Sequence, residues 1–286
     1  LPKNVESTEF FVQILDIATG TGTFIVEIIE VIYKTMMEKW VSDKQNPKKI
    51  SQMWNNYVSD HLLTRLYGFE LMMAPYAIAH MKIGLKLAQT GYHLDAKQRV
   101  QVFLANSLDQ PHDTPNQQRM FTNVLANEAK SANKIKMGAP ITVMVGNPPY
   151  AGESANSSID INGNATFIGK IIRTYFEADG QPLGERTSKW LQDDYVKFIR
   201  FGQFQIEKVS VGVLGYITNH GYLDNPTFRG MRQSLMKSFP LIEIIDLHGN
   251  SKKKERCPDG SIDTNVFDIM VGTAVSVFTK TFKKRK

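Results

Sequence analysis

Short runs of branched apolar residues alternate along this chain with stretches in which apolar residues recur every three or four positions. The short runs are typical of buried strands, and the longer spacing is typical of amphipathic helices. The expected strands are residues 10–17, 66–69, 100–105, 141–145, 211–218, 241–247 and 271–279. The expected helices are near residues 24–36, 50–66, 75–87, 194–209 and 228–239. This alternation predicts an α/β fold with an open, mostly parallel seven-stranded sheet and helices on both faces.

The polar motifs of the chain follow the expected strands. They are Asp16 to Gly22, Glu70, Asn106 to Asp109, and Asn147 to Tyr150. In open sheets of this kind the ligand binds at the carboxyl ends of the strands. We therefore expect the four motifs to contribute to one site.

The segment from Asp16 to Gly22 joins the first strand to the first helix. Glycines there let the backbone turn sharply and approach a ligand closely. The dinucleotide fingerprint Gly-x-Gly-x-x-Gly needs a third glycine, but Ile25 occupies that position. The loop therefore disfavours a pyrophosphate and favours an adenosine-containing ligand without phosphates, with an ordinary tight turn as the alternative.

Glu70 ends the second expected strand and precedes a helix. A carboxylate in that place can accept both ribose hydroxyls of a nucleoside bound across the sheet. An acid at a helix N-terminus also offsets the helix dipole. The residue alone leaves both interpretations open.

Asn147-Pro148-Pro149-Tyr150 is the most specific motif. Its two prolines stop the strand, because they fix φ and carry no N–H donor. The Asn147 amide oxygen and a proline carbonyl then form two acceptors beside an aromatic ring. Two acceptors on a conjugated amino group favour its pyramidal form, which frees the lone pair, and such preorganised dipoles accelerate reactions by about 10²–10³ each. The motif therefore predicts chemistry on a planar NH₂ group.

In order, these four motifs resemble motifs I to IV of S-adenosylmethionine-dependent N6-adenine DNA methyltransferases. Asp194 to Phe198 resembles motif V, Gly215 to Asn219 the next strand motif, and Val266-Phe267 motif VIII. Tyr67 to Tyr76 is most similar to the methyltransferase domains of single-polypeptide (type ISP) restriction–modification enzymes. The resemblance covers nearly the whole chain and implies the Rossmann-like fold of class I methyltransferases.

The resemblance also implies roles for individual residues. The catalytic residues would be Asn147, Pro148, Pro149 and Tyr150, with Tyr150 and Phe267 on the two faces of the target base. S-adenosylmethionine would be bound by Asp16, Ala18, Thr19, Gly20, Gly22, Phe24, Glu70, Leu71, Asn106, Ser107, Leu108, Asp109 and Asn147. In-line transfer from a sulfonium needs no metal, so we expect none.

Three features depart from the family pattern. No motif X precedes the glycine loop and no target-recognition domain follows motif VIII, so we expect residues 1–286 to be one methyltransferase domain of a larger enzyme. Asn106 stands where relatives usually carry an acid, which leaves either Asn106 or Asp109 to contact the adenine of the cofactor. Within the domain we expect a helical insertion at 42–66 and surface loops at 110–138 and 151–193.

The implied function is site-specific methylation of adenine N6 in a restriction–modification system. The expected partners are double-stranded DNA with a flipped adenine and flanking recognition, nuclease or helicase domains. The motif also occurs in enzymes that modify cytosine N4, guanine N2 in RNA, or a glutamine amide, because all of these groups are planar amines. A non-catalytic nucleic-acid-binding scaffold is the remaining alternative.

Composition adds weak constraints. The net charge of +6 allows a polyanionic partner without requiring one. Cys257 is the only cysteine, which excludes an internal disulfide framework and fits a reducing compartment. No run of about 18 apolar residues is present, so we expect no membrane span and a bacterial cytoplasmic location.

Overall fold

The structure is a computed structural model that describes residues 11–95, 98–109, 120–149, 154, 156–184 and 188–282. The chain divides into two compact units. Unit 1 comprises Leu1–Ser107 and Pro111–Pro140, and unit 2 comprises Leu108–Gln110 and Ile141–Lys286. The strand order of the seven-stranded sheet is β3-β2-β1-β4-β7-β9-β8. This order, with mostly parallel strands, confirms the predicted fold class.

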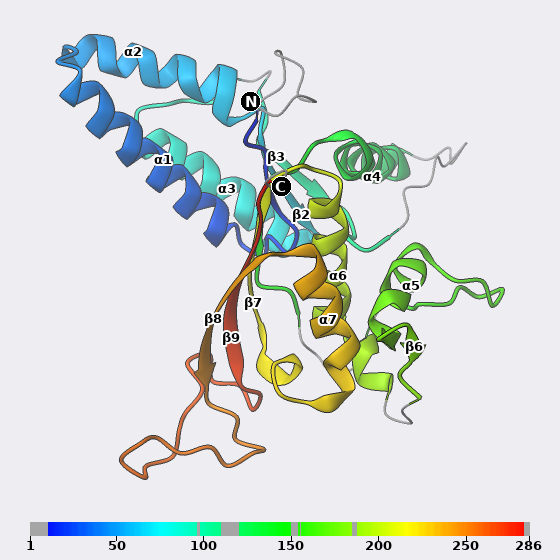
Figure 1. Ribbon diagram of the computed structural model, residues 1–286. Coiled ribbons are helices and arrows are strands. Elements are labelled where there is room, and N and C mark those ends of the chain that lie inside the picture. Colours follow the sequence, from blue (N-terminus) through cyan, green and yellow to red (C-terminus); the bar gives the residue numbers. More distant parts are fainter. Residues whose placement is uncertain are drawn as a thin grey trace. The chain divides into compact units, whose positions relative to one another are not determined.

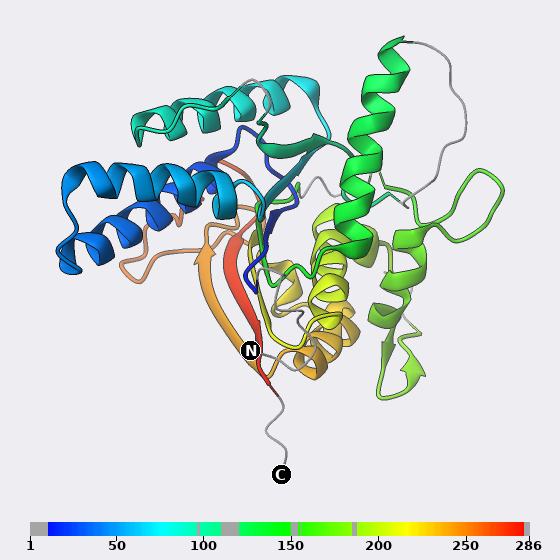
Figure 2. The ribbon, with the colours of Figure 1, turned by 90° about the horizontal axis from the view of Figure 1, so that it is seen from above.

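In unit 1, three parallel strands lie between helices (Figures 1 and 2). The elements are β1 (Ile14–Asp16), α1 (Thr23–Ser42), β2 (Leu66–Glu70), α3 (Met73–Gln89), β3 (Gln101–Leu104) and α4 (Met120–Gly138). Both views place α1 and α3 on one side of these strands and α4 on the other. Every residue of β1 is therefore buried, which explains why the strand is continuously apolar up to its last residue, Asp16.

The segment between α1 and β2 is helical. It contains α2 (Pro47–Tyr57) and a turn of π-helix, η1 (Val58–Leu62). Pro47 occupies the first turn of α2, and the Asn46 side chain accepts a hydrogen bond from the Lys49 amide at 2.8 Å. Trp54 is 1% exposed, and its ring centroid lies 4.9 Å from that of Tyr33 on α1. Aromatic packing thus joins α2 to α1.

The helix α4 differs from the surface loop that we predicted for residues 110–138. Its sequence is polar, but Glu128, Ala132 and Lys136 recur every four residues and are only 8%, 0% and 4% exposed. Two charged side chains therefore lie on the buried face. An apolar-periodicity argument misses such a helix, because the residues that mark its inner face are not apolar.

In unit 2, β9 runs antiparallel to both of its neighbours, and β4 and β7 are parallel. The bounds are β4 (Val143–Gly146), α6 (Asp194–Glu207), β7 (Gly212–Asn219), η4 (His220–Tyr222), η5 (Pro226–Phe228), α7 (Arg229–Ser238), β8 (Leu241–His248) and β9 (Thr273–Lys280). Figures 1 and 2 show α6 and α7 on one face of these strands. On β7, alternate residues from Gly212 to Thr218 are buried, which is the period of a strand with one covered face.

The prediction of a surface loop at 151–193 is wrong for much of the described part of this segment. This part contains α5 (Phe167–Ile171), η2 (Ile172–Phe176), β5 (Glu177–Ala178), β6 (Gln181–Pro182) and η3 (Ser188–Gln192). Ile172, Tyr175 and Leu191 are at most 1% exposed, and the Tyr175 hydroxyl donates to Gln203 Oε1 on α6 at 2.7 Å. The segment packs as short turns, which are too brief to produce a recognisable period.

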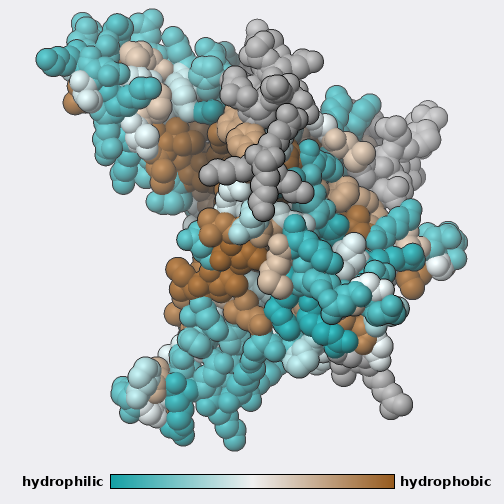
Figure 3. Space-filling view, viewed as in Figure 1, coloured by the Kyte–Doolittle hydropathy of each residue, from teal (hydrophilic) through white to brown (hydrophobic). Residues whose placement is uncertain are grey.

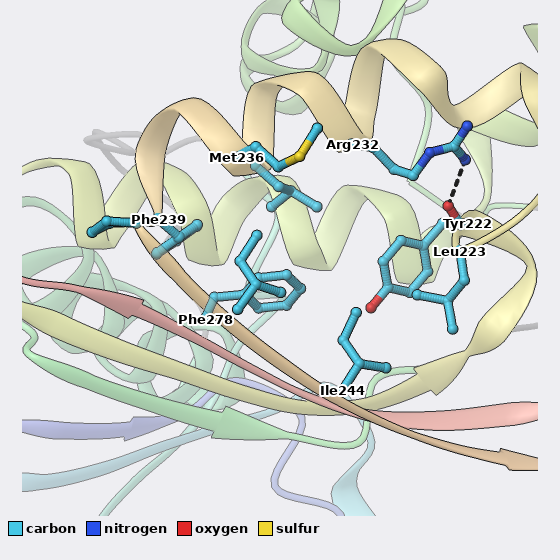
Figure 4. A pocket seen from close by; sticks show the side chains of 10 residues that line it. Tyr222, Leu223, Arg232, Met236, Phe239, Ile244 and Phe278 are labelled. Atoms are coloured by element: carbon cyan, nitrogen blue, oxygen red, sulfur yellow. Dashed lines mark hydrogen bonds between the residues drawn. The ribbon is translucent and has the colours of Figure 1, made fainter.

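A cavity of about 430 Å³ lies in unit 2 between α7 and strands β8 and β9 (Figure 4). Its polar edge includes the Arg232 guanidinium, which donates to the Tyr222 carbonyl at 2.8 Å. The lining is otherwise mainly apolar and includes Leu223, Leu235, Met236, Phe239, Pro240, Ile242, Ile244 and Phe278.

An apolar patch lies over β8, as Figure 3 shows in brown. Leu241, Ile244 and Ile245 are 48%, 41% and 65% exposed there. Among the described residues, no helix combines the length and the apolar character that crossing a bilayer requires.

Candidate active site

Three strand ends of unit 1 are joined by hydrogen bonds at one edge of the sheet. The Gly20 amide, after β1, donates to Glu70 Oε2 at the end of β2 at 2.8 Å. The Ser107 hydroxyl, after β3, donates to the Ile17 carbonyl at 2.6 Å. The structure therefore brings together the glycine loop, Glu70 and Ser107, as the parallel register predicts.

The glycine loop depends on glycine at two positions. Gly20 and Gly22 have φ of +53° and +82°, a backbone conformation that residues other than glycine rarely adopt. A Cβ at Gly22 would also lie 3.2 Å from both Cα and Cβ of Ala79 on α3. Gly22 precedes α1, so the loop and the start of this helix press against α3. Phe24 lies in the first turn of α1 and is partly exposed.

Asp16 is the most strongly perturbed group of the loop. Its side chain is fully buried, and Oδ1 accepts a hydrogen bond from the Ala18 amide at 3.1 Å. Oδ2 has no hydrogen-bond partner among the described residues. Burial raises the pKa of Asp16 to about 7, and the charge of Glu70 adds to this, although the Ala18 N–H opposes it. A buried acceptor of this kind fits a ligand that supplies a positive charge or a donor.

Glu70 contributes to the shape of the loop. Oε2 accepts from Gly20, and Oε1 accepts from the Met72 amide at 2.8 Å. Met72 is the N-cap residue of α3, so the second bond agrees with the interpretation of Glu70 as an acid at a helix start. Each carboxylate oxygen has a second acceptor site. Glu70 therefore also retains capacity for ribose hydroxyls, and the neighbouring Leu71 is 61% exposed.

The turn after β3 is held from α4. Lys136, which sequence reasoning missed, donates from Nζ to the Asn106 carbonyl at 2.5 Å. The same ammonium lies 5.6 Å from the centroid of the Phe69 ring on β2. Asn106 is half-buried, Ser107 and Leu108 are buried, and Asp109 is exposed. Both Asn106 and Asp109 therefore stay candidates for the adenine contact.

A second charged pair supports β3. Arg99 donates to the Glu128 carboxylate at 2.7 and 3.2 Å, and Glu128 Oε2 accepts from the Leu104 amide at 3.2 Å. Burial acts to raise the pKa of Glu128, but the bonds from Arg99 and Leu104 outweigh it and the pKa is lowered. Glu128 is therefore an ionised side chain of α4 that pairs with the end of β3. Its sequence context gave no signal of this role.

In unit 2, the tetrapeptide motif begins directly after β4. Asn147 is exposed, Pro148 is buried and Pro149 is exposed. Tyr150 lies outside the described residues. β4 pairs with β7 up to Gly146, opposite Tyr216, so Asn147 is the first residue after the pairing stops. The prolines therefore end the strand as predicted.

The chain beyond the tetrapeptide is tied to the first turns of α6. The Ser154 hydroxyl donates to Asp194 Oδ1 at 2.5 Å, and Lys197 Nζ donates to Ser154 Oγ at 2.8 Å. The Asn156 amide also donates to Asp194 Oδ1, at 2.9 Å. Asp194 and Lys197 are 5% and 1% exposed. The segment that resembles motif V thus anchors the loop that follows the tetrapeptide.

Phe267 lies in the segment that joins β8 to β9 and is 42% exposed. Its amide donates to Asn265 Oδ1 at 2.8 Å, and the adjacent Val266 is 62% exposed. The ring is therefore accessible to a ligand from solvent.

The sequence pattern of the Eco57I restriction-modification methylase family matches residues 64–253, which is more than half of the chain. The chain belongs to this family. This confirms the resemblance that we drew from the motifs. No protein with a curated description matches the chain.

Solved structures are similar over almost the whole chain. One is the ATP-dependent Type ISP restriction-modification enzyme LlaBIII bound to DNA, with 24% identity, a TM-score of 0.71, and coverage of 96% of this chain and 17% of that one. Another is a DrdV–DNA complex, with 28% identity, a TM-score of 0.65, and coverage of 96% and 24%. A nuclease-deletion mutant of the Type ISP enzyme LlaGI, with a DNA substrate mimic, has 21% identity, a TM-score of 0.69, and coverage of 95% and 21%. This chain therefore corresponds to a quarter or less of each of these chains.

Proposed function

We propose that this restriction-modification methylase transfers a methyl group from S-adenosylmethionine to the N6 amino group of adenine in double-stranded DNA. The observation that carries the proposal is Asn147-Pro148-Pro149 directly after β4 in a member of this family. A planar amine needs acceptors on its N–H bonds, and a strand end stopped by two prolines offers them.

Most of the residues proposed for the cofactor lie in unit 1 and fit it, while Asp109 belongs to unit 2. Asp16 presents a buried oxygen without a described partner, which suits a cationic ligand, and Gly20 leaves the loop without a side chain at φ of +53°. Glu70 would hold the ribose, and Asn106 or Asp109 the adenine. When bound, S-adenosylmethionine supplies a methyl group whose bond to sulfur breaks as the bond to nitrogen forms, which leaves a neutral thioether.

The residues of unit 2 would act on the acceptor amine. The Asn147 side-chain oxygen and the Pro148 carbonyl would accept the two amino protons, and one proton leaves to solvent once nitrogen carries the methyl group. Tyr150 and Phe267 would stack on the two faces of the base. The base must first leave the duplex, at a cost of a few kcal/mol that such stacking offsets.

DNA is the proposed partner, since LlaBIII, DrdV and LlaGI were each solved with DNA or a DNA mimic. Those chains are several times longer than this one. We therefore propose that sequence recognition and any nuclease or helicase activity belong to further domains. We also propose that the protein acts in the bacterial cytoplasm.

The test is transfer of a labelled methyl group from S-adenosylmethionine to duplex DNA, followed by digestion to nucleosides. We expect label in N6-methyladenine. Asn147→Ala should lower turnover by about 10²-fold or more while cofactor affinity is retained, because the lost acceptor acts on the transition state. Asn162→Ala is the matched control, since Asn162 is an exposed asparagine elsewhere in unit 2.

The other outcomes identify the alternatives. Label in cytosine would overturn adenine as the acceptor, and so would transfer to RNA guanine or to protein, offered in parallel reactions, without transfer to DNA. DNA binding without any transfer, in the presence of bound cofactor, would indicate a non-catalytic scaffold.

A further inference from the structure

We propose that His220 is a positioning residue for the β8–β9 loop, residues 249–272, and thereby for Phe267. His220 would act through this loop and would not touch the substrate. The inference rests on the proposed function in one respect, namely that Phe267 contacts the target base. The physical basis is that the buried imidazole contacts both ends of the loop.

One ring nitrogen of His220 is bound to the strand that enters the loop. His220 follows β7 directly and is only 4% exposed. Its Nδ1 lies 2.9 Å from Asp246 Oδ1 on β8. Burial acts to raise the pKa of Asp246, but bonds from the His248 amide and from His220 outweigh it and the pKa is lowered. The carboxylate is therefore an ionised acceptor for the Nδ1–H group.

The other ring nitrogen faces the first residues of the loop. Nε2 lies 3.2 Å from Asn250 Nδ2 and 4.0 Å from Glu255 Oε1. With hydrogen on Nδ1, the ring can donate to Asp246, and Nε2 can accept from the Asn250 side-chain amide. Asn250 in turn donates from its backbone to Glu255 Oε2 at 2.8 Å. Among the described residues no group of His, Cys, Asp and Glu has the arrangement of a metal site.

The far end of the loop contacts the backbone amide of His220 and packs against its ring. The His220 amide donates to the Gly272 carbonyl at 3.0 Å. A Cβ at Gly272 would lie 2.3 Å from ring atoms of His220, so only glycine fits beside the ring. Gly272 directly precedes β9. His220 thus bridges the residues at which the loop leaves β8 and returns to β9.

A short hydrogen-bonded path leads from this base to Phe267. The Asn265 side chain donates from Nδ2 to the Val271 carbonyl at 2.6 Å, and its Oδ1 accepts from the Phe267 amide at 2.8 Å. Asn265 also packs against Gly249, where a Cβ would lie 2.5 Å from Asn265 Cα. The position of Phe267 is therefore set by the two ends of the loop that His220 joins.

The decisive experiment is a double-mutant cycle between His220→Phe and Phe267→Ala. Phenylalanine keeps a ring beside Gly272 and the backbone bond to its carbonyl, but it loses the side-chain hydrogen bonds to Asp246 and Asn250. Phe267→Ala alone should lower kcat/KM for DNA by about 5- to 150-fold, the range expected for loss of a stacked base. His220→Phe should lower kcat/KM by a similar factor in the wild-type background and by less than about twofold in the Phe267→Ala background. His248→Phe is the matched control, because His248 approaches the same carboxylate, at 3.7 Å, but is exposed.

A second measurement does not depend on activity. Lys252, Lys253 and Lys254 lie in the loop, so trypsin reports on its order. His220→Phe and the milder Asn250→Ala should each increase the rate of cleavage at these lysines about tenfold or more, and His248→Phe should leave it unchanged. If His220→Phe fails to fold, the double-mutant cycle and the trypsin experiment are done with Asn250→Ala in its place.

The outcomes separate this inference from the proposed function. Equal effects of the His220 substitution with and without the Phe267 ring, or unchanged trypsin cleavage, would overturn the positioning role even if the wild-type protein methylates adenine. Label in a product other than N6-methyladenine would refute the proposed function, whereas the cleavage result would still decide whether His220 orders the loop.

Discussion

Replacement of Asp16 by asparagine tests the cofactor site through pH. The carboxyl has a pKa of about 7 in the folded chain and an ordinary value of 3.8, because burial disfavours its charge. The folded state therefore holds a proton that the unfolded state has already lost between these two values. The free energy of unfolding should fall as pH rises from about 4 to about 7 and should then be constant as far as Asp16 is concerned.

The size of this effect follows from the pKa difference of about three units. Each unit corresponds to about 1.4 kcal/mol, so ionised Asp16 costs the unliganded fold up to about 4 kcal/mol. Asp16→Asn removes the charge and keeps an oxygen that can accept from the Ala18 amide. The difference in unfolding free energy between wild type and variant should therefore depend on pH only within that window. Asp43→Asn, at an exposed aspartate in unit 1, is the control.

Cofactor binding should have the opposite pH dependence. A cationic ligand beside Asp16 favours the ionised carboxylate, so binding to the protonated form releases a proton. Affinity for S-adenosylmethionine should rise by up to about tenfold per pH unit below 7 and level off above it. Asp16→Asn should bind more weakly and without this dependence. Titration calorimetry from pH 5.5 to 7.5 measures both, and a wild-type affinity that is flat across this range would refute the role of Asp16.

Two further substitutions test the packing of the site. Gly68→Ala places a Cβ 2.6 Å from Thr19 Oγ1 and should destabilise the fold by about 1–3 kcal/mol. Gly84→Ala, on a helix, adds a Cβ that meets nothing within 4 Å and should stabilise the fold by about 0.5–1 kcal/mol. Urea unfolding measures both changes, and equal stabilities of the two variants would contradict this prediction. Lys136→Met removes the bond to the Asn106 carbonyl and should weaken cofactor binding about tenfold, as measured by calorimetry. Lys134→Met, at an exposed position on the same helix, should leave the affinity unchanged. Equal affinities of the two variants would show that Lys136 does not support the cofactor site.

The sequence was informative where a physical rule links residue type to position. Parallel strands bring their carboxyl ends to one edge, so the polar residues after β1, β2 and β3 could be expected to meet, and Gly20, Glu70 and Ser107 take part in hydrogen bonds that join them. Glycine at a strand–helix junction predicted a tight turn, and Gly22 has the positive φ that such a turn needs. Pro148 and Pro149 predicted where β4 ends.

The periodicity of apolar residues failed where polar side chains are buried. The inner face of α4 carries Glu128 and Lys136, and α6 buries Asp194 and Lys197. Charged residues are rarely buried unless they are paired, and the partners here are backbone groups or side chains far along the chain. A single sequence gives no signal of such partners, because they are set by the tertiary fold.

These hidden polar groups share one kind of contact, which explains why a search for ligand-binding residues overlooks them. Lys136 donates to the carbonyl of Asn106, Lys197 donates to Ser154 beyond the tetrapeptide, and the His220 ring contacts Asp246 on β8 and Asn250 at the start of the loop that carries Phe267. Each side chain fixes a segment next to a predicted ligand residue, and it offers its charge or its hydrogen bonds to that segment. Loops that must hold a ligand precisely lack the backbone ladders of a sheet, so buried polar side chains supply the bonds that such loops cannot make internally.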